Sequence, residues 1–139
     1  MSNFIKLSPE LFVDIDSIIL ISANGDRGIN IVIDGKYKTN SIPYYWCSEP
    51  VQWNDIVDIP ELNRDTFIHT TAFELWDLNR SYDTMINKKY IKIAKAYDDD
   101  KTKSRLIWTH GEELVDIPID DVAKILMEEG LICQHYTKE

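Results

Sequence analysis

The segment FIKLSPELFVDI, residues 4–15, has a counterpart later in the chain, FIHTTAFELWDL, residues 67–78. The counterpart lies 63 or 64 positions further on, depending on how the two segments are aligned. Each is followed by a β-rich stretch with a glycine-containing turn, Asp34-Gly35 in the first case and His110-Gly111 in the second. Self-similarity at a fixed spacing is typical of repeated structural units. We therefore expect two related β units, and chance similarity between isoleucine-rich strands is the alternative.

The first forty residues show the patterns of strands and tight turns. LFVDIDSIILIS, residues 11–22, is β-branched and largely apolar, which is typical of a strand buried on both faces. NGDRG, residues 24–28, supplies residues that tolerate a positive φ, as a hairpin turn requires. INIVIDG, residues 29–35, alternates between isoleucine and other residues and leads into KYKTNS, residues 36–41. These patterns predict an antiparallel β-meander.

Residues 43–65 form a segment that proline breaks into short pieces. Ser48 can cap a short helix with Pro50 in its first turn, and Pro60 ends or redirects that helix. The β pattern resumes after Thr66. The later elements are a strand in 67–78, a polar passage at 79–83, strands at 90–97, 104–109 and 112–117, and a charged turn at 98–103.

The last predicted element is a helix over residues 119–129. Asp120 and Asp121 lie near its amino end, where the helix dipole favours negative charge, and Gly130 stands at its end. Val122, Ile125 and Leu126 belong to an apolar stripe at helical spacing. We expect this stripe to pack on one side of the sheet.

The predicted fold class is therefore α+β and β-rich, with antiparallel meanders or small barrel-like sheets and a C-terminal helix. The 139 residues are expected to form a single compact domain. Within it, residues 1–42 and 66–130 would be the two related β units, joined by the aromatic and proline-rich segment 43–65.

The segment RLIWTHGEELVDIPIDDVAKIL, residues 105–126, resembles the strand–turn–strand–helix ending of small FlbD-like flagellar proteins and of many phage β-rich proteins. The resemblance covers about a third of the chain and consists of a hydrophobic pattern, so it transfers no functional residue. It implies an origin in a phage and a role in the virion or as an accessory protein.

Charge and composition exclude several classes of function. Hydrophobic residues make up 44% of the chain and charged residues 28%, which is typical of a globular protein. The net charge of −9, from 15 basic and 24 acidic residues, disfavours direct binding to nucleic acid. The sequence contains neither a membrane-length apolar run nor an amino-terminal secretion signal. Cys47 and Cys133 are expected to be free thiols in a reducing compartment.

No motif for catalysis, metal binding or cofactor binding stands out. The five glycines form neither a phosphate-binding loop nor a dinucleotide motif, and His69 fits a strand face better than a catalytic site. Asp14 and Asp16 are predicted on one strand face about 7 Å apart, which allows a carboxylate pair but is also common by chance. We predict a protein that is not an enzyme and has no metal, catalytic residue or cofactor.

The candidate binding residues are aromatic. Tyr44, Tyr45, Trp46 and Trp53 lie in YYWCSEPVQW, between prolines. In a strand, Tyr44 and Trp46 would share one face and Tyr45 the other. Trp46 and Trp53 could belong to the core, with one tyrosine half exposed. Alternatively the segment is a contact surface, because tyrosine and tryptophan are enriched at the centres of protein interfaces. Tyr45 is then the expected anchor.

These observations together favour a structural or assembly protein that acts through protein–protein contacts, such as a bacteriophage virion component: a connector, ring or tail-associated subunit. Its expected partners are other protein subunits in an oligomeric assembly, with no nucleic acid and no membrane. Its expected location is the cytoplasm or the virion. The alternative is an acidic inhibitor that mimics nucleic acid and binds a basic host protein.

Overall fold

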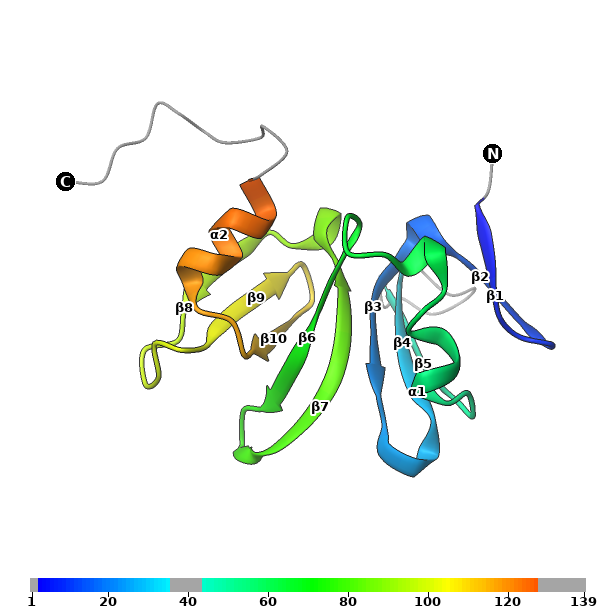
Figure 1. Cartoon of the computed structure of the whole chain (residues 1–139), viewed down its shortest axis with the longest axis horizontal. Coiled ribbons are helices and arrows are strands. Elements are labelled where there is room, and N and C mark those ends of the chain that lie inside the picture. The colour runs from blue at the N-terminus through cyan, green and yellow to red at the C-terminus, as the bar shows by residue number, and fades with distance from the viewer. Residues whose placement is uncertain (1–2, 36–43, 128–139) are drawn as a thin grey trace.

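The computed structural model describes residues 3–35 and 44–127 of the chain. Antiparallel strands dominate the fold and a helix follows them at its carboxyl end, which confirms the predicted β-rich α+β class (Figure 1). Within the described residues, one sheet has two strands, β1 and β2. The other has eight, in the order β5-β4-β3-β7-β6-β10-β9-β8, so strands that are distant in the sequence meet at β3–β7 and β6–β10.

The elements fall into an N-terminal half and a C-terminal half. The N-terminal half contains β1 (Phe4–Ser8), β2 (Leu11–Asp14), β3 (Ile18–Ala23), β4 (Ile29–Asp34), β5 (Tyr44–Glu49) and the short helix α1 (Trp53–Ile56). The C-terminal half contains β6 (Phe67–Glu74), β7 (Asp77–Asn87), β8 (Ile93–Ala96), β9 (Ser104–Trp108), β10 (Gly111–Val115) and helix α2 (Ile119–Met127). Each half thus has a hairpin, three further strands and a helix, in that order.

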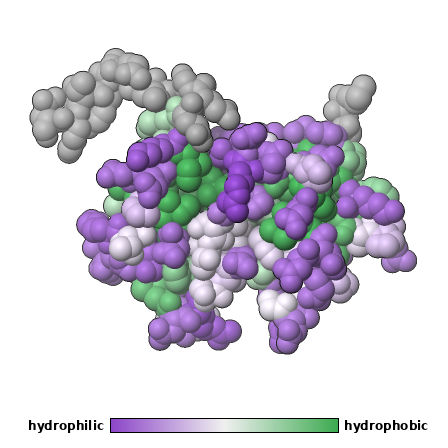
Figure 2. Space-filling view, in the orientation of Figure 1, coloured by the Kyte–Doolittle hydropathy of each residue, from purple (hydrophilic) through white to green (hydrophobic). Residues whose placement is uncertain are grey.

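Most buried apolar side chains of the described residues fall into two clusters. The first cluster is formed by Ile5, Leu7, Val13, Ile15, Ile18, Ile21, Ile29, Ile31, Val51, Ile56, Leu62, Phe67 and Met85. The second cluster is formed by Ile19, Leu20, Val32, Ile68, Ala72, Ile86, Leu106, Val115 and Val122. On the face drawn in Figure 2, hydrophobic residues gather in two areas with a largely hydrophilic band between them.

Each cluster also contains side chains from the other half of the chain. Phe67 and Met85 come from the C-terminal half and lie in the first cluster. Leu20 and Val32 come from the N-terminal half and lie in the second cluster. The exchange occurs where β3 pairs with β7, because successive side chains of a strand point to opposite faces of the sheet. The two halves are therefore held together by burial on both faces of one strand pair.

The two hairpins pair their strands in the same register. In β1–β2, Phe4 pairs with Asp14, Ile5 with Val13 and Lys6 with Phe12. In β6–β7, Phe67 pairs with Asn87, Ile68 with Ile86 and His69 with Met85. The spacing of 63 positions noted in the sequence therefore aligns β1 with β6. The β6–β7 hairpin is longer, so the second strands match at a larger spacing.

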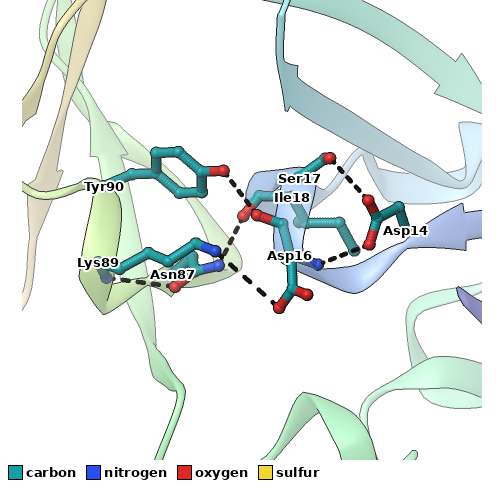
Figure 3. Close-up of polar contacts among 7 residues, drawn as sticks. All are labelled: Asp14, Asp16, Ser17, Ile18, Asn87, Lys89 and Tyr90. Carbon is teal, nitrogen blue, oxygen red and sulfur yellow. Dashed lines mark hydrogen bonds and ion pairs between the residues drawn. The ribbon is translucent and has the colours of Figure 1, made fainter. Parts of the chain in front are cut away.

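A 3-10 helix follows each hairpin and has the same cap. After β2, Asp14 accepts a hydrogen bond from the backbone N–H of Asp16 and begins η1 (Ile15–Ser17). After β7, Asn87 accepts one from the N–H of Lys89 and begins η4 (Lys88–Tyr90). Figure 3 shows the two turns side by side, with Tyr90 Oη donating to the Asp16 carbonyl at 2.6 Å.

The turn at η1 corrects two predictions. Residues 11–22 are not one strand, because the Asp14 cap stops β2 before β3 begins. Asp14 and Asp16 do not share a strand face either, since Asp16 lies in the 3-10 helix and its carboxylate is 3.9 Å from Lys89 Nζ. The Asp14 carboxylate therefore caps the turn, and the Asp16 carboxylate forms a surface ion pair. The predicted pair of carboxylates on one strand face is wrong.

Two further predictions about local structure are wrong. Ser48 belongs to strand β5 and donates to Asn30 Oδ1 at 2.7 Å, whereas Gln52 precedes helix α1. Residues 79–83 form part of β7, the longest strand, and are not a polar connection. They are mostly exposed because the tip of the β6–β7 hairpin extends into solvent. The expected continuation of the meander at residues 36–41 lies outside the described residues.

Glycine is required in the turn between β3 and β4. Gly28 ends the η2 turn (Gly25–Arg27) with φ of 105°, a region that favours glycine. A Cβ atom at this position would collide with the carbonyl oxygen of Glu49. Gly25 also has a positive φ, so the hairpin turn predicted at residues 24–28 is confirmed.

The predicted C-terminal helix is confirmed over its described part. In α2, Val122 is fully buried in the second cluster, and Ile125 and Leu126 pack against that cluster as partly buried side chains. The helix therefore covers the core of the C-terminal half. Residues 128 and 129 lie outside the described residues.

Replacing Leu126 by Ala should lower the free energy of unfolding by about 2 kcal/mol, near the lower end for a leucine because the side chain is only partly buried. Chemical denaturation followed by circular dichroism measures this change. Met127→Ala on the exposed side of the same helix is the matched control and should cost less than about 0.5 kcal/mol. Equal effects of the two substitutions would contradict the packing of α2.

Candidate functional site

A cleft of about 310 Å³ lies where the two halves meet. Leu20 and Val32 line it from the N-terminal half, and Tyr82 and Glu113 line it from the C-terminal half. Trp46 of β5 also lines it, with 56% of its surface exposed. A wider hollow of about 510 Å³ lies beside the cleft and shares Tyr82 with it.

Two polar side chains in the cleft form a short hydrogen bond. Tyr82 Oη on β7 donates to Glu113 Oε1 on β10 at 2.8 Å. Burial, with the nearby carboxylate of Glu74 as a smaller contribution, raises the pKa of Glu113 to about 7, although the bond from Tyr82 opposes this rise. Burial and the charge of Glu113 also raise the pKa of Tyr82, so Tyr82 remains a hydrogen-bond donor. Glu113 therefore gains or loses its proton near neutral pH.

Trp108 gives the cleft an indole ring that packs closely over Gly111. A Cβ atom at Gly111 would lie 2.5 Å from Cζ2 of Trp108, so a larger residue there would displace the ring. The indole N–H is buried and has no hydrogen-bond partner in the described part of the chain. A buried donor without an acceptor is unfavourable by about 1–3 kcal/mol. An acceptor that reached this N–H would remove the penalty.

The cleft offers hydrogen-bonding groups and ring surface. Glu113 can donate a hydrogen bond when protonated and accept bonds when ionised, and Trp46 offers ring surface. Across residues 3–35 and 44–127 no group of three or more His, Cys, Asp or Glu side chains could hold a metal ion. His69, which the sequence assigned to a strand face, lies on β6 with Nε2 2.6 Å from the Leu62 carbonyl oxygen.

The structure places the four predicted binding residues in different surroundings. Tyr44 and Tyr45 are in strand β5, and their side chains lie outside the described structure. Trp46 lies on the same strand at the cleft and is exposed. Trp53 begins helix α1 and packs, partly buried, against the first cluster. Core placement is therefore wrong for Trp46 and holds for Trp53, which the cleft does not include.

Sequence reasoning did not identify Tyr82, Trp108 and Glu113. Tyr82 was placed in a polar connection, although it is an inward position of strand β7. Trp108 and Glu113 lie on neighbouring strands, and their meeting with Tyr82 depends on the pairing of β6 with β10. No local pattern reports such a pairing between distant segments.

Cys47, on strand β5, is a free thiol as predicted, whereas Cys133 lies outside the described residues. Burial, followed by the neighbouring carboxylate of Glu49, raises the pKa of the Cys47 thiol to about 11. The thiol is therefore protonated and a poor nucleophile at neutral pH.

Comparison of the chain with protein-family models, curated proteins and solved structures gives no match. None of the helices in residues 3–35 and 44–127 is long and apolar enough to span a membrane.

The stability of the fold should depend on the ionisation of Glu113. The folded protein retains this proton up to about pH 7, whereas the unfolded chain loses it near the ordinary value of 4.5. The free energy of unfolding should thus fall as pH rises from about 4.5 to 7, by on the order of 3 kcal/mol from this group. Denaturation of Glu113→Gln across this range should lack that decrease.

The matched control is Glu61→Gln, at an exposed carboxylate far from the cleft in the sequence. It should keep the pH dependence of the unmodified protein. Parallel stability curves for the unmodified protein and Glu113→Gln would show that Glu113 titrates at its ordinary pKa.

Truncation of Trp46 and of Trp53 should affect stability to different extents. Trp46→Ala should leave the melting temperature nearly unchanged, because that ring is exposed. Trp53→Ala should destabilise the fold by about 1–3 kcal/mol, because part of its ring packs on the first cluster. Thermal unfolding of both variants checks this, and a large loss in Trp46→Ala would place that ring in the core.

Proposed function

We propose that this chain is a non-enzymatic structural or assembly protein that works through contacts with other protein subunits. The observation that carries the proposal is the position of its exposed apolar side chains. They occupy the β1–β2 hairpin, the rim of the cleft, the tip of the β6–β7 hairpin, strand β8 and the end of α2. The residues, in chain order, are Phe4, Phe12, Trp46, Leu75, Trp76, Leu78, Ile93 and Met127. Large exposed rings are the residues that dominate binding energy in protein interfaces.

The cleft supports the same proposal. Trp46 stands beside a carboxyl that can either donate or accept a hydrogen bond near neutral pH. An exposed ring next to adaptable polar groups suits the insertion of a side chain from a partner. Tyr45, on the same strand as Trp46, stays the predicted anchor of the aromatic segment.

Assignment to a bacteriophage virion, as a connector, ring or tail-associated subunit, is part of the proposal. It rests on the resemblance of residues 105–126 to FlbD-like and phage proteins. Duplication of one β unit is proposed as well. Its support is the common register of the two hairpins and the common cap of the two 3-10 helices.

The net charge of −9 favours a second candidate, an acidic inhibitor that occupies the nucleic-acid site of a basic host protein. The exposed carboxylates of Asp98 and Asp99 in the β8–β9 turn would belong to such a surface.

Light scattering coupled to size-exclusion chromatography separates the two candidates. A structural subunit should form an oligomer whose mass rises with concentration and changes little with salt, because its contacts are mainly apolar. The inhibitor should remain a monomer and bind a basic protein in a salt-sensitive manner. A monomer at every concentration would contradict the assembly proposal.

A further inference from the structure

The junction between the two halves shows how a hairpin of this fold can join a neighbouring sheet. Strand β7 pairs antiparallel with β3, with Leu20 opposite Ile86 and Ile21 opposite Met85. Two buried side chains strengthen the junction: Thr84 Oγ1 donates to the Ile21 carbonyl at 3.2 Å and Asn87 Nδ2 to the Ile18 carbonyl at 2.9 Å.

Side chains from the C-terminal hairpin complete the core of the N-terminal half. Phe67 and Met85 lie on the side of the hairpin that faces the first cluster, and both have 0% of their surface exposed. In return, Leu20 of β3 is buried in the second cluster with 3% exposed. The junction thus consists of one strand pairing and an exchange of apolar side chains in both directions.

The β1–β2 hairpin carries the same apolar positions, but in the described structure neither of its strands pairs with a further strand. By the common register of the two hairpins, Phe4 matches Phe67 and Phe12 matches Met85. Phe4 and Phe12 are each 58% exposed, although their counterparts are fully buried. Among the described residues β2 pairs only with β1, so its other edge is open.

Strand β8 is the matching open surface at the other end of the sheet. Ile91 caps the end of η4 and Ile18 caps the end of η1. Ile93 follows its cap by two positions, as Leu20 does, so Ile93 corresponds to Leu20. Ile93 is 52% exposed, and in the described structure β8 pairs only with β9. Figure 1 places β8 and the β1–β2 hairpin at opposite ends of the molecule.

We propose that β2 of one copy of this chain pairs antiparallel with β8 of a second copy and so repeats the β7–β3 junction between molecules. The register of the inner junction then sets Val13 opposite Ile93 and Phe12 opposite Ala94. Phe4 and Phe12 are buried against the C-terminal half of the second copy, and Ile93 against the N-terminal half of the first.

Charge at this junction is complementary. The same register brings Asp14 of β2 opposite Lys92, the residue before β8. Opposite charges on facing strand positions stabilise pairing, and a lysine at an edge strand disfavours pairing with strands that lack an acidic residue there. The two ends of one chain therefore fit each other better than they fit themselves.

Such a contact uses different surfaces on the two copies. A linear complex built by this contact keeps one open hairpin and one open β8 at its ends, so it grows either until it closes into a ring or as an open filament. The inference rests on the proposed function, because it specifies which surfaces build the assembly and that the partner is a second copy of the chain.

Two substitutions test the junction. Phe12→Asp blocks the hairpin and Ile93→Asp blocks β8, and each side chain is exposed, so folding should be retained. Each variant alone should be a monomer by sedimentation velocity, with the dissociation constant of the junction raised about 30-fold or more. Because each variant retains one intact surface, an equimolar mixture should form a heterodimer of two chains and nothing larger.

Leu75→Asp is the matched control, since Leu75 is 50% exposed in the β6–β7 turn and lies outside the junction. This variant should assemble like the unmodified protein. If the protein assembles but Phe12→Asp and Ile93→Asp do not change its mass, the junction is wrong while the assembly function stands. Loss of assembly in Phe12→Asp alone would indicate a symmetric hairpin contact and overturn the inference. A monomeric unmodified protein would overturn both proposals.

Discussion

The pairing of β3 with β7 is the contact on which the other contacts of this fold depend. Because neighbouring residues of a strand point to opposite faces, one strand pair places Met85 in the first cluster and Leu20 in the second. Neither cluster is complete without side chains from the other half of the chain. The cleft exists for the same reason, since its walls are β3 and β4 on one side and β7 and β10 on the other.

The separation of β1 and β2 from the large sheet follows from the length of their hairpin. In the C-terminal half, β10 joins β6 through Ala72 and Phe73, which lie beyond the part of β6 that matches β1. Strand β1 ends at Ser8 and has no equivalent residues. A short hairpin therefore remains a two-stranded sheet with one exposed face, whereas the long one is built into the sheet on both edges.

Local patterns predicted much of this fold and little of its site. The strand at residues 104–108 and the helix that begins at Ile119 were predictable, because the spacing of apolar residues within each segment fits a single type of element. The break at Asp14 was missed because its carboxylate competes with strand pairing by capping a turn. Tyr82 and Glu113 are joined only by the β6–β10 register, which no single segment encodes. Trp46 stood out in the sequence because ring surface is visible in composition, but its exposure at the cleft was not predicted.

Completion of the first cluster by Phe67 and Met85 has a consequence for synthesis of the chain. As the chain leaves the ribosome, β1 to β5 emerge before the two side chains that seal their core, so this half exposes apolar surface until β7 has been translated. Contacts between residues this far apart in sequence slow folding, because the intervening chain must first be ordered. Apolar surface that stays exposed during synthesis favours aggregation of incomplete chains.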